Sequence, residues 1–520
     1  MRKVTTTVAA ALVAFSFAAC NKTNNVTPEQ GANSYASVRV NVKNSLKAIN
    51  DGDQVDNKGT EAESKVSSMA LVGAGATWAE DDITATGNIY KGIAKPVTVT
   101  GPQILGLVLN NNTLAGEAKE AAEYGNSADA VANLAALSTD NKFVMTSKVM
   151  TQTIKPNIKE ADAETQNMLD FGKVERVVAK GIVQKAATFD ETSENGTVPM
   201  EGVKYAAVNG ATKTYIFANQ AGERKLGVED PNQYDGFKSA IDGIAPTQED
   251  AAAMDAGLIR RGQLGADLGG YASKAVADPT VDDYTDANPG VKEGVYFLEN
   301  SGEANAANKA EGFYRFAYAM IYATFVPTTV YEVDEAADPE FVAKAGTGKY
   351  YAINKTGKWA QTTQDKGQEG QLVYKLKEAT YTKGTTFYMG EKDGRFYLTR
   401  NAAAQSTVEG ALGQKAFTYT NGRAGYRALW NRQSPDGNEK LVNNASARRN
   451  NIYVLNIKKF QKIGMPWNPS DPNDPDLPKP KDSEEPEYPD NPNIEDQDSY
   501  VAVQCQMVPW NVIGREVELE

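Results

Sequence analysis

The sequence predicts a mainly β protein, with two antiparallel β-sandwich domains, short helical insertions, a proline-rich tether and a C-terminal strand. Many short segments alternate apolar and polar residues, which is the two-residue period of a strand with one buried face. Polar turns separate these segments, and no regular alternation of strands with long helices occurs, which favours antiparallel sheets. A chain of 520 residues is long enough for more than one hydrophobic core.

Composition excludes several classes of function. The net charge of −13 opposes binding to nucleic acid, because phosphate contacts need a basic surface. Histidine is absent, which removes the commonest general base and the commonest metal ligand. Carboxylate pairs are the remaining acid–base machinery, and no local pair stands out. We therefore predict no enzyme activity, no cofactor and no metal.

Two kinds of local motif do not predict a ligand site. The stretch GTGKYY at 346–351 lacks the spacing of a phosphate loop and a Ser or Thr after its lysine. The acidic stretches SDPNDPD and DGDQVDNKG lack the ligand spacing of a calcium loop, and we interpret them as solvated linkers.

The N-terminus predicts a lipoprotein signal peptide over residues 1–20. It has a basic start, an apolar run and small residues before Cys20, and its last four residues, Phe17 to Cys20, resemble a bacterial lipobox. The alternative is an ordinary signal peptide with an incidental cysteine. Cys505, the other of the two cysteines, has no partner in the chain if Cys20 is lipidated, and we interpret it as a small buried hydrophobe.

The first predicted strand, about Ser34–Val42, follows a polar spacer within a propeptide that we place at 21–47. The stretch SYASVRVNV puts Ala36, Val38, Val40 and Val42 on one face. A polar, turn-rich segment at 44–65 then separates this strand from the next apolar run. We expect that segment to be a loop that a protease can reach.

A polar break at 190–202 divides the body into an N-terminal sandwich at 48–190 and a C-terminal sandwich at 195–465. In the first half we expect strands near 141–150 and 173–183 and a helix at 116–138. In the second half we expect strands at 203–219, 312–333, 422–430 and 450–460, with a hairpin around Asp393-Gly394.

The last two segments are a tether at 466–498 and a strand at 499–520. Nine prolines lie between Pro466 and Pro492, so this part lacks backbone donors and favours an extended conformation. The strand that follows carries alternating apolar residues, interrupted once by Pro509: Val501, Val503, Cys505, Met507, Trp510 and Val512.

The terminal strand has two interpretations. It folds back and completes the sandwich of its own chain, or it pairs with an open sheet edge on a neighbouring molecule by β-strand addition. An open edge beside an apolar groove invites aggregation and has to be covered until assembly. The strand at 34–42 is the natural cover, and the loop behind it contains a Lys47–Ala48 bond.

The chain resembles the Bacteroidetes type V pilus fimbrillins, with most likeness to the shaft subunit of the minor fimbriae. The likeness lies in the order of several segments: the lipobox, SYASVRVNVKNSLKA, VERVVAKGIV, YRFAYAMIYATFVP, NGRAGYRALW, RRNNIYVLNIKKFQKIGMPWNP and VPWNV. The resemblance implies two transthyretin-like sandwich domains.

The resemblance also implies a route of export, proteolytic processing and assembly. Members of the family are exported as outer-membrane lipoproteins, and a surface protease of Arg or Lys specificity removes the lipidated N-terminus with its first strand. The matching bond is Lys47–Ala48, while Arg39, Lys43 and Lys58 remain alternative sites. Subunits then join identical subunits head to tail through the C-terminal donor strand, with accessory anchor and tip pilins, in a cell-surface fimbria that serves adhesion and colonisation.

Two other classes of function stay open at this point. One is a surface lipoprotein that binds glycan or host protein and does not polymerise. The other is an enzyme that works with a pair of acidic side chains.

Overall fold

The computed structural model describes much of the chain. The described residues are 34–42, 61–113, 137–208, 210–211, 216–217, 258–259, 274–275, 294–298, 317–343, 351–353, 359–361, 370–430, 447, 449–466 and 501–509. They form a mainly β protein, as the sequence predicts, with strands that gather into two bodies. Among these residues, no helix is long and apolar enough to cross a bilayer.

The N-terminal body comprises the described residues from 34 to 176. Its strands are β1 (Ser34–Asn41), β2 (Ser68–Val72), β3 (Thr77–Ala79), β4 (Ile83–Thr86), β5 (Ile89–Val97), β6 (Gly101–Leu109), β7 (Met145–Ser147), β8 (Met150–Ile154) and β9 (Met168–Arg176). Its short helical pieces are α1 (Glu61–Ser64), η1 (Glu80–Asp82), η3 (Glu160–Asp162) and α4 (Ala163–Gln166). The strands form one sheet in the order β3-β2-β6-β7-β9-β1-β5-β4, with β8 paired to β6.

This sheet surrounds a single apolar core, to which almost every strand of the body contributes buried side chains. Trp78 of β3 is fully buried and lies against Gly92 of β5, where a Cβ atom would come within 2.7 Å of the indole Nε1. A glycine is therefore required at position 92 for the two elements to approach this closely.

The chain leaves the N-terminal body at Val177. β9 ends at Arg176, and the next strand is β10 (Val178–Asp190). Among the described elements, β10 pairs only with β17 and β30, which belong to the second body. The change of sheet therefore comes before the polar break expected at 190–202. The apolar side chains between Val177 and Val183 belong to the core of the second body, so β10 is part of that body. The sequence has no turn residues between β9 and β10 that would mark this change.

The C-terminal body comprises the described residues from 178 onward. Its strands up to residue 333 are β10, β11 (Thr192–Ser193), β12 (Gly196–Thr197), β13 (Lys204–Val208), β14 (Gly210–Ala211), β15 (Leu258–Ile259), β16 (Lys274–Ala275), β17 (Val295–Leu298), β18 (Tyr318–Thr324), β19 (Val326–Pro327) and β20 (Val330–Val333). The remaining elements are β21 (Glu340–Ala343), β22 (Tyr351–Ile353), β23 (Trp359–Gln361), β24 (Gly370–Val373), β25 (Leu376–Ala379), β26 (Phe387–Gly390), β27 (Phe396–Tyr397), α7 (Arg400–Ala404), β28 (Ala416–Tyr419), η5 (Thr420–Gly422), β29 (Arg423–Leu429), β30 (Asn451–Phe460), β31 (Met465–Pro466) and β32 (Val501–Pro509).

Two sheets of the C-terminal body pack face to face. One has the order β17-β10-β30-β32 and the other β16-β13-β18-β29-β31. Trp430 is fully buried between them and stacks on Phe297 at 5.3 Å between ring centroids. A Cβ on Gly181 of β10 would come within 2.5 Å of the Trp430 ring, so this body repeats the packing of a tryptophan on a strand glycine.

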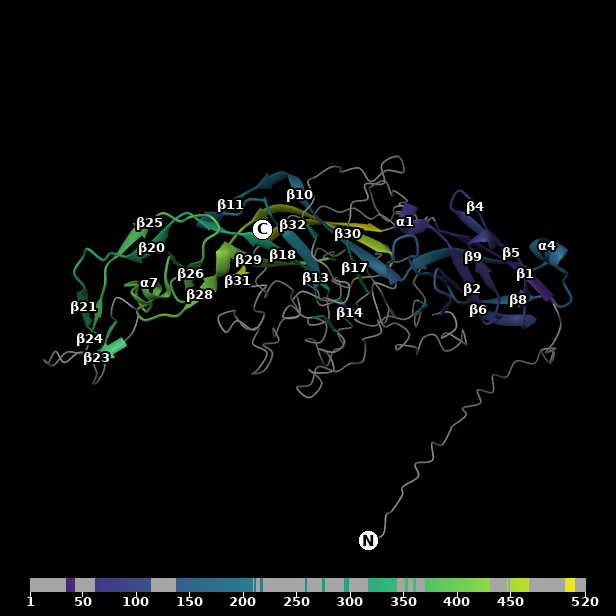
Figure 1. Cartoon of the computed structure of the whole chain (residues 1–520), viewed down its shortest axis with the longest axis horizontal. Coiled ribbons are helices and arrows are strands. Elements are labelled where there is room, and N and C mark those ends of the chain that lie inside the picture. Colours follow the sequence, from purple (N-terminus) through teal and green to yellow (C-terminus); the bar gives the residue numbers. More distant parts are fainter. Residues whose placement is uncertain are drawn as a thin grey trace, which may run out of the picture.

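A further sheet with the order β25-β20-β27-β26-β28 lies at the end of the molecule away from the N-terminal body (Figure 1). β10 and β30 run through the middle of the long axis and the N-terminal strands occupy the opposite end (Figure 1). The hairpin expected around Asp393-Gly394 is present between β26 and β27, and Gly394 adopts a positive φ of 65°. The turn thus uses the backbone freedom of glycine.

Several details differ from the sequence-based expectations. The region 312–333 contains three strands, β18, β19 and β20, in place of one long strand. Strand pairing is mostly antiparallel, but β1 and β9, β10 and β30, and β20 and β27 pair in parallel. The helix expected at 116–138 lies almost wholly outside the described residues.

Candidate functional site

The first strand, β1, lies in the interior of the N-terminal sheet. It pairs antiparallel with β5 from Ser34 opposite Val97 to Asn41 opposite Ile89. On its other side it pairs in parallel with β9, with Ser37 opposite Met168. The segment expected to be removed therefore connects two parts of the sheet and does not lie at its margin.

The apolar face of β1 points into the core. Ala36, Val38, Val40 and Val42 are the four residues that the sequence places on one face, and each is at most 2% exposed. They pack with buried residues contributed by β2, β3, β6 and β9. The two-residue period thus identified the buried face of this strand correctly.

Polar contacts hold the beginning of β1 in register. The Ser34 hydroxyl donates to the Lys155 carbonyl at 2.6 Å, and the Asn167 side-chain amide donates to Ser34 Oγ at 3.2 Å and to the Tyr35 carbonyl at 3.0 Å. The Tyr35 backbone N–H donates to the Ile158 carbonyl at 3.0 Å. Ser34 and Asn167 are buried, so these contacts are shielded from water.

On the opposite face, β1 is tied to β9 by an exposed ion pair. The Arg39 guanidinium donates to the Asp170 carboxylate, with Nε 3.1 Å from Oδ2. Burial alone raises the pKa of Asp170, but the hydrogen bonds from Arg39 and the Gly172 N–H outweigh it and hold that pKa below its usual value. The pair therefore stabilises the folded chain fully above the ordinary pKa of an aspartate, and this stabilisation is lost as the pH falls through the lowered pKa of Asp170.

One side chain of β1 fits its surroundings poorly. Ser37 is fully buried, and within the described residues its hydroxyl has no hydrogen-bond partner. A buried hydroxyl without a partner costs on the order of 1–3 kcal/mol. The strand therefore occupies its place with less stability than an apolar strand would have there.

Ser37→Ala is expected to stabilise the uncut chain by about 1 kcal/mol, because it removes the unpaired hydroxyl and leaves the rest of the strand unchanged. The measurement is the midpoint of chemical denaturation of the full-length protein. Ser34→Ala is the matched control, since it removes a hydroxyl that is paired, and it should destabilise. A destabilising Ser37→Ala would show that the hydroxyl does have a partner.

The last strand, β32, lies at the edge of a C-terminal sheet in its own chain. It pairs antiparallel with β30, from Asn451 opposite Pro509 to Phe460 opposite Val501. Among the described strands, β30 is its only pairing partner, whereas β1 has two. In this single chain the terminal strand thus takes the first of its two interpretations and folds back.

The other predicted site residues have the following places. Val501, Val503, Cys505 and Met507 lie in β32. Cys20, Lys47, Ala48, Trp510 and Val512 lie outside the described residues. The structure does not bring β1 and β32 together, because they belong to sheets of different bodies.

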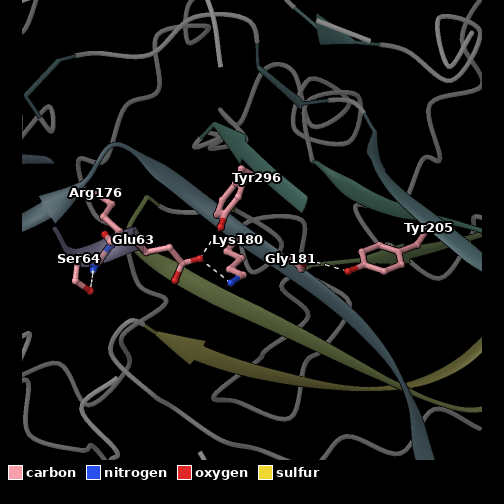
Figure 2. Close-up of polar contacts among 7 residues, drawn as sticks. All are labelled: Glu63, Ser64, Arg176, Lys180, Gly181, Tyr205 and Tyr296. Atoms are coloured by element: carbon pink, nitrogen blue, oxygen red, sulfur yellow. Dashed lines mark hydrogen bonds and ion pairs between the residues drawn. The ribbon is translucent and has the colours of Figure 1, made fainter. Parts of the chain in front are cut away.

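A buried polar cluster lies where the two bodies meet, and it combines Glu63, Ser64, Arg176, Lys180 and Tyr296 (Figure 2). The Lys180 ammonium lies 2.6 Å from Glu63 Oε1, and the Tyr296 hydroxyl donates to the same oxygen at 2.5 Å. The side chains of Glu63 and Lys180 are each only 2% exposed. The ion pair therefore stands in a nearly dry environment.

Arg176 joins the cluster to both bodies. Its Nε donates to the Glu63 carbonyl at 2.9 Å, and its Nη1 donates to Asn450 Oδ1 at 3.3 Å. The Asn450 N–H in turn donates to the Val178 carbonyl at 2.8 Å. The last residue of β9 is thereby fastened to the segment that precedes β30.

The electrostatics of this cluster are dominated by burial. Burial lowers the pKa of Arg176 to about 10 and also lowers the pKa of Lys180, and in both cases the negative charge of Glu63 opposes the shift. Burial together with the same carboxylate raises the pKa of Tyr296. At neutral pH Arg176 therefore stays protonated, and Glu63 is the carboxylate that compensates its buried charge.

Sequence reasoning missed this cluster. The available signal was Lys180, a lysine in the otherwise apolar run VVAKGIV, because a charged residue on a buried strand requires a partner. Glu63 stands in a polar segment that we interpreted as a loop, and nothing there marks it as that partner. Among the described residues, no group of three or more potential ligand side chains is arranged to hold a metal ion.

The fold defines a class: a mainly β protein whose first described strand lies in the interior of one sheet and whose last described strand lies at the edge of another. Residues 417–516 match the family described as "Major fimbrial subunit protein type IV, Fimbrillin, C-terminal", a range that includes β29, β30, β31 and β32. The resemblance seen in the sequence is thereby confirmed over these residues, which form a fimbrillin C-terminal domain.

Relatives with curated names extend the match over most of the chain. Two sequences named "Minor fimbrium subunit Mfa1", both from Porphyromonas gingivalis, are 24% identical over 488 residues, which is 88% of this chain and 86% of the relative. A crystal structure of a fimbrilin from Porphyromonas gingivalis W83 is 15% identical, covering 93% of this chain and 99% of that one, with a TM-score of 0.37. Because this score is below 0.5, the relationship rests on the sequence matches.

Proposed function

We propose that this protein is a structural subunit of a cell-surface fimbria that serves adhesion and colonisation. It is exported as a lipoprotein through Cys20, cut at Lys47–Ala48, and polymerised by exchange of the terminal strand, Ser499–Glu520. The family match and the relatives named as fimbrium subunits support this assignment. In this proposal the protein has a structural role and no catalytic one.

The observation that carries the proposal is the position of β1. It precedes the expected cleavage site in the sequence and yet completes the interior of a sheet, between β5 and β9. Removing it opens two strand edges beside an apolar slot that four buried side chains had filled. Such a slot is costly in water and is satisfied by another apolar strand.

The terminal strand has suitable properties for this slot. It is nine residues long, compared with eight for β1, and its apolar residues Val501, Val503, Cys505 and Met507 recur with the same two-residue period. Each apolar side chain that it buries contributes roughly 1.5–3 kcal/mol. Since the donor strand and the slot lie on different bodies, the addition is head to tail and does not close, which produces a fibre.

The proposed partners follow from this cycle. The precursor is held in the outer membrane by its lipid until an Arg- or Lys-specific surface protease cuts the loop after β1. The mature subunit then binds identical subunits, and accessory anchor and tip pilins bind the two ends of the fibre. Arg39, Lys43 and Lys58 remain alternative cleavage sites.

One observation favours a second function, that of a surface lipoprotein that binds glycan or host protein as a monomer. β32 pairs with β30 of its own chain, as a strand would that completes its own sheet and is not donated to a neighbouring molecule. For the fimbrial subunit, this pairing is a resting position that must be given up when a neighbour is bound.

Mass spectrometry of protein extracted from the cell surface separates the two functions. We expect mature protein that begins at Ala48 and runs as a ladder in SDS without boiling. A lipidated N-terminus that still includes residues 34–42, on a protein that runs only as a monomer, would refute the fimbrial subunit and support the monomeric binder.

A further inference from the structure

Removal of β1 raises a mechanical problem in the N-terminal sheet. β5 pairs with β1 on one side and with β4 on the other, and β4 forms the end of the sheet. Once β1 has left, the hairpin of β4 and β5 therefore has no strand pairing to the rest of the body among the described strands. A groove with a disordered wall binds an incoming strand more weakly, because the wall has to be ordered on binding.

Trp78 connects this hairpin to the body independently of β1. Its indole N–H donates to the Ile93 carbonyl of β5 at 2.6 Å. Its five-membered ring lies against Gly92, since a Cβ there would be 2.7 Å from Nε1 and 2.8 Å from Cδ1. Trp78 belongs to β3, which pairs with β2 and so stays attached to the other part of the sheet.

Trp78 also lies next to the strand that is to be replaced. The same Cβ on Gly92 would come within 2.9 Å of Val38 Cγ2, so the Val38 side chain and the indole share the space over this glycine. Val38 is paired directly with Gly92 across the two strands. A strand that takes the place of β1 must present a side chain at this point that fits beside the indole.

Weaker contacts support the same hairpin at its ends. The Thr98 backbone N–H donates to the Ala74 carbonyl at 3.0 Å, and the Lys95 ammonium lies 2.9 Å from the Asp82 carboxylate. Lys95 and Asp82 are partly exposed, and pairs of this kind contribute little. The Tyr90 hydroxyl of β5 also donates to the Ser64 carbonyl at 3.3 Å, in a partly buried position. Trp78 is the fully buried side chain of β3 that packs on the middle of the hairpin.

We infer that Trp78 is a positioning residue for assembly: it holds the β4–β5 wall of the groove in place after β1 has left, and with Gly92 it sets the size of the side chain that the groove accepts opposite position 92. The inference rests on the proposed function, since it concerns the groove that strand exchange would use. The partner is a strand with an apolar face, and a side chain of the size of valine fits at that point.

The test uses the full-length chain with Trp78→Phe, cut in the loop after β1 by a trypsin-like protease, with the cut confirmed by mass spectrometry. Hydrogen exchange of the backbone amides of 83–97 is measured before and after the cut. Binding of a synthetic peptide of residues 34–42 to the cut chain is measured in parallel. Trp430→Phe is the matched control, because it shortens the tryptophan that packs on Gly181 in the other body.

Before the cut, we expect the backbone amides of 83–97 in the Trp78→Phe protein to exchange at rates within about twofold of those in the unmutated protein. After the cut, we expect exchange at least tenfold faster and peptide binding at least tenfold weaker than in the unmutated protein. A residue that only filled the core would change exchange equally before and after the cut. Trp430→Phe should leave both quantities unchanged in the N-terminal body.

The inference is overturned if the cut Trp78→Phe protein keeps normal protection and normal peptide binding. If Trp78→Phe does not fold before the cut, the unmutated cut chain is tested with a 34–42 peptide that carries Val38→Phe. This peptide should bind at least tenfold more weakly than the unmutated peptide, and equal binding overturns the inference. Cut unmutated protein that binds the peptide but forms no ladders refutes the fimbrial function and leaves the role of Trp78 intact. Cut protein that never releases 34–42 overturns both.

Discussion

Replacing Glu63 with alanine is expected to lower the free energy of unfolding by about 3–5 kcal/mol, because it leaves the Lys180 ammonium buried without its counter-charge. The two side chains lie 2.6 Å apart and are almost inaccessible to water. The Tyr296 hydroxyl loses its acceptor at the same time. The substitution should therefore affect the place where the N-terminal body meets β10 and β17.

The measurement is the midpoint of urea denaturation, followed by tryptophan fluorescence and by circular dichroism. The double substitution Glu63→Ala with Lys180→Met should recover much of the loss, since it removes the stranded charge and fills the space with an apolar chain. Glu201→Ala is a matched control: Glu201 pairs with Lys383 at 3.0 Å on the surface, and its loss should cost less than about 1 kcal/mol. A Glu63→Ala protein as stable as this control would contradict the assigned role.

Deleting residues 499–520 is expected to abolish polymer ladders and leave a folded monomer. β32 is an edge strand that pairs only with β30 among the described strands, so its loss leaves the remaining ladders of both bodies in place. In the proposed function the same residues supply the donor strand, and without them the groove of the next subunit stays empty. The expected effect is therefore complete loss of assembly with secondary structure retained.

Protein cut after β1 is run in SDS without boiling, and circular dichroism reports its fold. A double substitution of Gln504 and Gln506 by alanine is the matched control, because these polar residues alternate in the sequence with the apolar residues of the predicted donor strand. It should leave ladders intact. Ladders that persist in the deletion protein would show that assembly does not depend on the terminal strand.

Local patterns predicted the individual strands well. The alternation in SYASVRVNV identified the buried face of β1, and the apolar run at 450–460 became β30, in which eight of the ten residues are buried and the other two are partly buried. The dipeptide Asp393-Gly394 correctly marked a hairpin, because the positive φ that the turn requires is adopted readily by glycine. These features depend on side chains within a few residues of one another.

Sequence reasoning failed where partners lie far apart in the chain. The polar break at 190–202 placed β10 in the N-terminal half, whereas β10 pairs with β30, which lies much later in the chain. The same holds for Glu63, which meets Lys180 through the junction of the two bodies. Neither contact leaves a local period or motif.

The sequence by itself determined the mainly β class, the buried face of β1 and the resemblance to fimbrillins, because these follow from the two-residue period and from the order of segments along the chain. Only the tertiary structure decided that β1 is an interior strand between β5 and β9, that Trp78 ties the exposed hairpin to the body, and that a dry ion pair joins the two bodies. The physical reason is that hydrogen-bond partners in a sheet and counter-charges in a core are selected by position in space, which the spacing of residues along the chain does not specify.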